Sequence, residues 1–387
     1  MNIEKTVKSI DRYRRMCLNL QASENMILPE ALSLLSSDLS GRYWHEDESG
    51  TNSYGGIDSF RDILREGERC ATRLFGAEFA EIRPIGGHIA AAAVLRAITR
   101  PGDTIMHIPS RSGGYPGYDQ RYLPDLLSLK SIEIPFTDET QDIDMSELEV
   151  KVKNARPSVI ILGQSAFVKP YDLKSVSGIC SENGIRLVYD GSHVMGLIAG
   201  KAFQPDTLDY SDVLVGSTHK TMPGPQGGII LTNDAITMEK IRGQLTWTLQ
   251  DNFHLARVAS LALTLQKMIS FAEAYARRVV RNSYELGKTL YELSMGIRFS
   301  PWFSHSHQII VDDKWLSEKG LNRVEFSRTL ERNNIIVDRD GRIGTSEISR
   351  MGYEDMQTVA DLMVSAISGK NIREDVISVA EKIYGGT

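Results

Sequence analysis

Residues 158–190 read SVIILGQSAFVKPYDLKSVSGICSENGIRLVYD. The apolar runs at the two ends, residues 158–162 and 186–189, predict buried strands, and residues 172–182 predict a helix that ends at the turn Asn183-Gly184. A strand, a helix and a second strand within about 30 residues imply a parallel pair joined by a right-handed crossover. This stretch therefore predicts an α/β fold, with helices on both faces of a parallel sheet and ligands at the carboxyl ends of its strands.

The same alternation of apolar runs and helical segments extends on both sides of this unit. Further buried strands are expected at residues 104–108, 132–135, 212–215 and 228–231. We therefore expect a large α/β domain over residues 31–275. Residues 1–30, which carry charge at helical spacing at their start, are expected to precede it as an amphipathic N-terminal arm.

The pattern changes near residue 254, where apolar residues recur three and four positions apart for about 40 residues. This spacing predicts one or two long helices that lead out of the sheet domain. Short strands are expected beyond them at residues 307–312, 334–338 and 342–344, and helices at 322–333 and 353–368. The order predicts a smaller C-terminal α+β domain over residues 276–387.

The composition excludes several classes of protein. The chain has 387 residues, of which 41% are hydrophobic and 24% charged, as is typical of a globular protein with a large core. A net charge of −6 gives no basic surplus for a nucleic-acid backbone. Apolar stretches such as residues 89–95 are far shorter than the ~20 residues that span a membrane. With no apolar signal-peptide core at its start, the chain is expected to be soluble and cytoplasmic.

Neither a metal site nor a common nucleotide-binding loop is predicted. The cysteines Cys17, Cys70 and Cys180 are odd in number and widely spaced, unlike a disulfide framework or a zinc site. No G-x-G-x-x-G follows a strand, and the Gly287-Lys288-Thr289 sequence lacks the earlier glycine of a phosphate loop and lies in a helical pattern. His305 and His307 have no acidic or cysteine partner at metal-ligand spacing, which favours strand-edge histidines.

Polar residues follow two of the predicted strands. Asp190 comes directly after the run IRLVY, with His193 three residues later, and the run DVLVG leads to Lys220 and a Gly/Pro-rich turn. Burying an ammonium group is costly unless its pKa falls, and a neutral amine there is a nucleophile suited to forming an imine with an aldehyde. The alternatives are that Asp190 caps a turn and that Lys220 is a surface lysine.

Asp190 and Lys220 together suggest pyridoxal phosphate. This cofactor needs a lysine for its aldehyde, a carboxylate to keep its pyridine nitrogen protonated, and hydrogen-bond donors for its phosphate. Gly86-Gly87, which open an alanine-rich helix, would supply free N–H groups for the phosphate. The alternative reading of these glycines is tight helix packing.

Several motifs between residues 18 and 352 resemble one known family. They are LNLQASEN at 18–25, YGG at 54–56, LFGAE at 74–78, PGDT at 101–104, DGSHVMGL at 190–197 and THKT at 218–221. In these motifs the chain resembles the serine hydroxymethyltransferases, pyridoxal phosphate enzymes of the aspartate-aminotransferase-like fold (fold type I). The resemblance implies a large α/β/α domain with a parallel sheet and a smaller C-terminal domain.

The resemblance implies a role for each matching residue of the cofactor site. Lys220 would form the imine with the cofactor and Asp190 would pair with its pyridine nitrogen. His193 and Ser165 would lie at the phenolic oxygen of the ring, and Gly87 and His88 would hold the phosphate. Tyr115 stands where the family has a histidine stacked on the ring, and an aromatic face can do the same. Ser217 and His219, beside the lysine, complete the candidate cofactor-binding and catalytic residues.

The substrate residues implied by the resemblance come from other parts of the chain. Ser23 and Arg350 would bind the α-carboxylate of an amino acid, with Arg350 as a bidentate fork. The spacing of Arg350 is closer to that of archaeal and other divergent members, whereas bacterial members have the arginine at the position of Met351. The alternative is that Arg350 is a surface residue. Glu46, the candidate base for the β-hydroxyl proton, and Tyr54 match residues that the family supplies from the partner subunit. An obligate homodimer with shared active sites is therefore expected, and a dimer of dimers is the alternative assembly.

Three departures concern the use of tetrahydrofolate. Ser53 stands where the folate pocket of the family has a tyrosine, Gln226 replaces an arginine, and Asp251-Asn252 replace a glycine pair. Two activities therefore stay open. One is a hydroxymethyltransferase-like reaction at the Cα–Cβ bond of serine or a related β-hydroxy-α-amino acid, through a glycyl quinonoid and with or without tetrahydrofolate. The other is a folate-independent threonine-type aldolase or transaldolase. A catalytically silent scaffold is the third hypothesis, against which the intact Lys220 and Asp190 argue.

Overall fold

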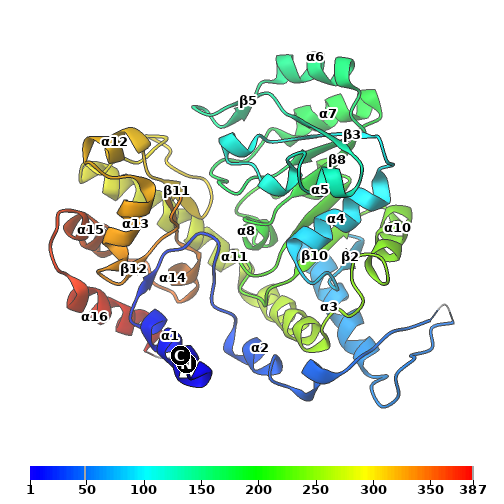
Figure 1. Ribbon diagram of the computed structural model, residues 1–387, viewed down its shortest axis with the longest axis horizontal. Coiled ribbons are helices and arrows are strands. Elements are labelled where there is room, and N and C mark those ends of the chain that lie inside the picture. Colours follow the sequence, from blue (N-terminus) through cyan, green and yellow to red (C-terminus); the bar gives the residue numbers. More distant parts are fainter. Residues whose placement is uncertain (48, 386–387) are drawn as a thin grey trace. The chain divides into compact units, whose positions relative to one another are not determined.

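The computed structural model describes residues 1–47 and 49–385, which form two compact units. The larger unit is residues 25–273, and the smaller unit combines residues 1–24 with residues 274–387. The sequence placed the start of the C-terminal domain at residue 276 and set residues 1–30 apart as an arm. In the structure, most of that arm belongs to the smaller unit (Figure 1).

A seven-stranded sheet forms the centre of the larger unit, in the order β2-β10-β9-β8-β7-β3-β4. Its strands are β2 (Phe79–Glu81), β3 (Thr104–His107), β4 (Lys130–Glu133), β7 (Val159–Leu162), β8 (Arg186–Asp190), β9 (Val213–Ser217) and β10 (Gly228–Thr232). The neighbours from β9 to β4 pair in parallel, whereas β10 is antiparallel to both β9 and β2. The predicted α/β fold with a mostly parallel sheet is confirmed, and β4 begins two residues earlier than expected.

The predicted crossover between β7 and β8 is helix α7 (Leu173–Asn183). The side chain of Asp172 caps its start by accepting a hydrogen bond from the N–H of Ser175, and the helix ends at Gly184 with a φ of 65°. Local sequence signals therefore set both ends of this helix.

The larger unit also contains helices and short strands outside this sheet. They are α2 (Pro29–Leu34), η1 (Asp38–Gly41), α3 (Phe60–Phe75), α4 (Gly87–Ile98), η2 (Ser110–Ser112), η3 (Pro116–Tyr118), α5 (Leu123–Leu126), β5 (Phe136–Thr137), β6 (Asp142–Ile143), α6 (Met145–Ala155), α8 (Met195–Ala199), α9 (Thr207–Tyr210) and α10 (Ala235–Leu245). Helix α4 packs against β9, β10 and α10 (Figure 1). Its alanines at positions 90–93 are buried, so the helix lies close to the sheet and its first residue reaches the carboxyl end of β9.

The smaller unit is built from short strands and helices. They are α1 (Ile3–Arg15), β1 (Leu18–Asn19), β11 (Gln308–Ile310), α12 (Asp313–Glu318), α13 (Arg323–Glu331), β12 (Ile335–Ile336), β13 (Arg342–Gly344), α14 (Ser346–Arg350), α15 (Met356–Ile367) and α16 (Arg373–Tyr384). Strand β1 pairs in parallel with β12, and β11 pairs antiparallel with β13. The pairing of β1 with β12 holds the start of the chain in this unit.

One long helix, α11 (Leu255–Glu292), belongs to both units, since residue 274 divides it. It is the long helical region expected from the sequence, and Gly287-Lys288-Thr289 lie inside it. By length and composition α11 could cross a membrane, but 67% of its most apolar window is buried. That degree of burial is typical of the core helix of a soluble protein.

Candidate active site

A cavity of about 200 Å³ lies in the larger unit, at the carboxyl ends of β8 and β9 and at the start of α4. It is lined by Gly87, His88, Tyr115, Gln164, Ser165, Asp190, Ser192, His193, Ser217, His219 and Lys220. Nine of these residues are candidates that the sequence singled out, eight for cofactor binding and His219 for catalysis. Tyr54, the remaining cofactor-binding candidate, does not line the cavity. Gln164 and Ser192 were not foreseen. The structure therefore brings residues from across more than 130 positions of the chain to one place.

Asp190 is the last residue of β8 and is only 6% exposed. Its Oδ2 accepts a hydrogen bond of 2.7 Å from the hydroxyl of Tyr118, and its Oδ1 accepts one of 3.0 Å from the N–H of Ser192. The second bond caps a turn, which is the alternative role that the sequence left open for Asp190. The same side chain also lines the cavity.

Lys220 lies three residues after the end of β9, in the connection to β10. Its side chain is half-buried and lines the cavity, which is contrary to the surface-lysine alternative, and its carbonyl accepts a hydrogen bond of 2.8 Å from Asn25. Helix α8 passes close beneath this connection at Gly196, where a Cβ would lie 2.3 Å from the carbonyl oxygen of Thr221. Only a glycine permits this approach.

His219, next to the lysine, is held as a neutral imidazole. Burial, with a contribution from the charge of Lys220, lowers the pKa of His219 to about 4. Its Nδ1 is buried and has no hydrogen-bond partner within residues 1–47 and 49–385. At neutral pH this ring is therefore an uncharged group with an unused polar atom inside the site.

The start of α4 provides a cradle for an anion. Gly87 is the first residue of this 12-residue helix, and a Cβ on it would lie 3.2 Å from the Cβ of Ser217. The backbone can therefore come close to β9 while the free N–H groups of the first turn stay available. His88 follows, and its Nδ1 lies 2.9 Å from the hydroxyl of Tyr115. Burial lowers the pKa of His88 against the opposing influence of Asp190.

Two tyrosines stand between this helix and Asp190. The ring of Tyr115 lies edge-on to that of Tyr118, with 5.4 Å between centroids and 84° between planes. A Cβ at Gly117 would be 2.3 Å from the Cε1 of Tyr115, so this glycine allows the Tyr115 ring to fold back. Tyr115 lines the cavity, as the stacking prediction requires, and Tyr118 lies behind it in the core.

Gln164 was missed by sequence reasoning although it stands two residues after the end of β7. Its Nε2 donates to the carbonyl of Ser112 at 2.9 Å and to the side chain of Gln141 at 3.2 Å, and its Oε1 accepts a hydrogen bond from Tyr171 at 2.8 Å. A polar residue just after a buried strand was a usable signal for Gln164, because Asp190 was found from the same kind of position.

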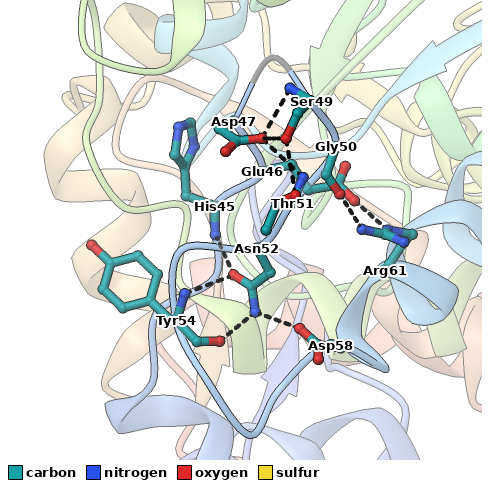
Figure 2. Close-up of polar contacts among 10 residues, drawn as sticks. All are labelled: His45, Glu46, Asp47, Ser49, Gly50, Thr51, Asn52, Tyr54, Asp58 and Arg61. Carbon is teal, nitrogen blue, oxygen red and sulfur yellow. Dashed lines mark hydrogen bonds and ion pairs between the residues drawn. The ribbon is translucent and has the colours of Figure 1, made fainter.

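Glu46 and Tyr54 belong to a loop that does not line this cavity as the structure describes it. Figure 2 shows the loop from His45 to Tyr54, closed by the side chain of Asn52, which bonds to both ends of the loop and, at 3.0 Å, to Asp58. Glu46 pairs with Arg61, which also donates to the carbonyl of Gly50 at 2.6 Å. Glu48 lies outside the described residues.

Tyr54 is 40% exposed, and its ring lies 5.5 Å from the equally exposed ring of Tyr43. Both tyrosines and Ser53 line an open hollow of about 630 Å³. Both of these large aromatic side chains are therefore exposed to solvent in a single chain.

The candidate substrate residues Ser23 and Arg350 lie in the smaller unit. The hydroxyl of Ser23 donates a hydrogen bond of 3.4 Å to Asp338, whose pKa burial raises to about 6. Arg350 ends α14, and its Nε and Nη2 are buried with no hydrogen-bond partner among the described residues. Burial lowers the pKa of Arg350. A buried guanidinium in this state is costly unless an anion binds to it.

These features fit pyridoxal phosphate. The cavity offers a half-buried lysine for the aldehyde, an ordered carboxylate for the pyridine nitrogen and a glycine at a helix N-terminus for the phosphate. No group of three or more metal-ligating side chains occurs in the part of the chain that the structure describes.

Comparisons with known proteins agree with this fit. The family model "Serine hydroxymethyltransferase" matches residues 1–348. The chain is 32% identical to the serine hydroxymethyltransferase of Methanosphaera stadtmanae and 34% identical to that of Methanothermobacter marburgensis. In both cases the match covers 97% of this chain and 92% of the relative.

The crystal structure of L-threonine transaldolase from Pseudomonas fluorescens in its internal aldimine state shares the fold. The TM-score is 0.86 at 23% identity, over 99% of this chain and 90% of that chain. The chain therefore belongs to the serine hydroxymethyltransferase family and is a pyridoxal phosphate enzyme of fold type I.

Proposed function

We propose that this protein makes or breaks the Cα–Cβ bond of serine or another β-hydroxy-α-amino acid. The observation that carries the proposal is the cavity in which Lys220, Asp190 and Gly87 meet. When bound, pyridoxal phosphate supplies an electron sink for the bond that is broken.

Each residue of the cavity has a distinct task in this proposal. The amine of Lys220 holds the aldehyde carbon of the cofactor, and the carboxylate of Asp190 holds a proton at the pyridine nitrogen. The N–H of Gly87 and the side chains of His88 and Ser217 bind the phosphate. Tyr115 covers the ring, while Ser165 and His193 bind its phenolic oxygen. His219 is a neutral hydrogen-bonding neighbour of the lysine, since its pKa is lowered to about 4.

Arg350 and Ser23 bind the α-carboxylate of the substrate. Support for Arg350 comes from two buried guanidinium nitrogens that have no hydrogen-bond partner among the described residues and that match the two oxygens of a carboxylate. By fixing the carboxylate, these residues orient the bond to be broken.

Glu46 acts as the base for the β-hydroxyl proton in the site of the partner subunit, and Tyr54 lines that site. The proposal is a homodimer with shared active sites. It is supported by the position of both residues outside the cavity of their own chain and by the exposed rings of Tyr43, Tyr54 and Trp247. We expect the dimer to work in the cytoplasm.

The second candidate is a folate-independent aldolase or transaldolase. The observation in its favour is Ser53, which lines the hollow beside Tyr54 where the family has a tyrosine for folate. The acceptor would then be an aldehyde rather than the one-carbon carrier.

The experiment compares two reactions of the protein loaded with pyridoxal phosphate. Serine turnover that depends on tetrahydrofolate supports the first candidate, and aldehyde release from threonine without folate supports the second. Loss of the visible absorption of the bound cofactor in Lys220→Ala is expected in both cases. A protein that binds the cofactor but catalyses neither of these reactions would overturn both and leave the silent scaffold.

A further inference from the structure

Tyr118 is a buried tyrosine whose hydroxyl is directed at the carboxylate of Asp190. The side chain is 2% exposed, and its hydroxyl donates a hydrogen bond of 2.7 Å to Oδ2. The resemblance to the serine hydroxymethyltransferases implies no role for Tyr118. The cavity lining does not include it either, since it stands behind Tyr115.

The surroundings of Tyr118 fix its hydroxyl in place. Its carbonyl accepts a hydrogen bond of 2.6 Å from the hydroxyl of Ser131, and its ring packs in the core with Leu123 and Leu129. The ring of Tyr115 lies edge-on at 5.4 Å. The phenol therefore has little freedom to turn away from Asp190.

The direction of this hydrogen bond is also fixed. Burial, and then the charge of Asp190, raise the pKa of Tyr118 well above its usual value, so the phenol keeps its proton at every pH of interest. The carboxylate can only accept and the phenol can only donate. A hydrogen bond from a neutral donor to a buried charge favours the charged form of the acceptor.

We propose that Tyr118 is a positioning residue for the cofactor, which holds the carboxylate of Asp190 oriented toward the pyridine nitrogen. The two oxygens of Asp190 divide their work: Oδ1 is held by the Ser192 N–H at 3.0 Å, and Oδ2 by Tyr118. Rotation of the carboxylate would break both bonds. This inference rests on the proposed role of Asp190, but not on which bond of which amino acid is broken.

A second buried tyrosine, next to Asp190 in β8, offers a matched control. Tyr189 is fully buried, precedes Asp190 in β8, and its hydroxyl has no hydrogen-bond partner among the residues that the structure describes. Successive side chains of a strand point to opposite faces. Tyr189→Phe therefore also removes one buried tyrosine hydroxyl, from the residue next to Asp190 in β8, without touching the carboxylate.

The test measures binding of pyridoxamine 5′-phosphate to the full-length apo protein. This probe has the ring and phosphate of the cofactor but no aldehyde, so its dissociation constant does not depend on an imine with Lys220. We expect Tyr118→Phe to raise the dissociation constant about tenfold, as for the loss of a hydrogen bond to a charged group. Tyr189→Phe should change it by less than about twofold.

Three further variants separate this role from simple packing. Asp190→Asn should weaken binding at least as much as Tyr118→Phe, and the double variant should be no weaker than Asp190→Asn alone, because both changes break one contact. Tyr118→His keeps a donor and should recover most of the affinity. It also gives the comparison if the phenylalanine variant does not fold.

Three outcomes would overturn the inference. In the first, Tyr118→Phe binds the probe like the wild type while Asp190→Asn does not. In the second, the two effects multiply in the double variant. In the third, Tyr118→His binds as weakly as the phenylalanine variant. Unchanged binding in Asp190→Asn would instead refute the proposed role of Asp190, which keeps the two failures distinct.

Discussion

Arg350 has an unusual electrostatic state for a single residue, because two of its nitrogens are buried without a partner in the described residues. If these nitrogens bind the substrate carboxylate, Arg350→Lys keeps the charge but loses the bidentate geometry. We expect the KM for the amino acid to rise about 10- to 100-fold, the range for charge-assisted hydrogen bonds. Steady-state kinetics with varied amino acid would measure it.

Arg328 provides the control, since it is exposed in α13 of the same unit. Arg328→Lys should leave the KM unchanged. Equal KM values for Arg350→Lys and the wild type would show that another group binds the carboxylate.

Asp338 makes the stability of the protein depend on pH. Burial raises the pKa of this carboxyl from 3.8 to about 6, so the folded protein binds its proton more tightly than the unfolded chain does. The stabilisation is fully present below about pH 4 and is lost as the pH rises through 6.

Asp338→Asn, which cannot ionise, should therefore gain about 1.4 kcal/mol of stability relative to the wild type as the pH rises from 5 to 7.5. Arg342 would still have Asp340 as an ionic partner. Urea unfolding at both pH values would measure the change, and a constant difference between the two proteins would contradict the prediction.

Sequence reasoning at this scale found the residues whose chemistry is unusual for their position. Lys220 and Asp190 stood out because charged groups rarely follow buried strands. Tyr118 did not, because an aromatic residue in an apolar neighbourhood is what a core requires. Its hydrogen bond joins positions 72 residues apart, and no local pattern encodes such a distance.

At the scale of elements, the contact of α8 with the connection after β9 decides where the lysine stands. A Cβ on Gly196 would lie 2.3 Å from the backbone of Thr221. Gly196→Ala should therefore displace the Lys220 segment, lower the free energy of unfolding by about 1–3 kcal/mol and weaken cofactor binding. Chemical denaturation and cofactor titration would measure the two effects.

Gly178 is the matched control, because it lies inside α7 with no atom within 4 Å of an added Cβ. Gly178→Ala should stabilise the protein by about 0.5–1 kcal/mol through helix propensity and leave cofactor binding unchanged. If Gly196→Ala also leaves stability and cofactor binding intact, the close approach of α8 to Thr221 does not determine the position of Lys220.

Elements with strong local signals were predicted almost to the residue. The helix α7 has an aspartate cap and a terminal glycine, and its flanking strands are continuous apolar runs. The strand β1 could not be predicted, because it has two residues and its partner β12 follows more than 300 residues later. Pairing over such a distance depends on the folded unit, so the start of the chain was predicted to be a separate arm.

For the whole molecule, the proposed dimer predicts that two inactive variants restore each other. The first variant, Lys220→Ala, lacks the amine in its own cavity, and the second variant, Glu46→Gln, lacks the base that it gives to the site of its partner. A mixed dimer has one site with both changes and one intact site. An equal mixture, dissociated and reassembled, should therefore recover about a quarter of the wild-type activity.

Each variant reassembled alone is the control and should stay inactive. Sedimentation would verify that dimers form again. Activity no higher than that of the separate variants would show that Glu46 serves the site of its own chain or none.

The reversed direction of β10 has a consequence for how the enzyme folds. Because β10 runs back along β9, the ten residues between them form a hairpin connection, and the nucleophile is carried on a sequence-local structure. Asp190 and Gly87 reach the same cavity only through strand crossovers, which close large loops and form slowly. A partly folded chain can thus present its amine before the rest of the pocket exists.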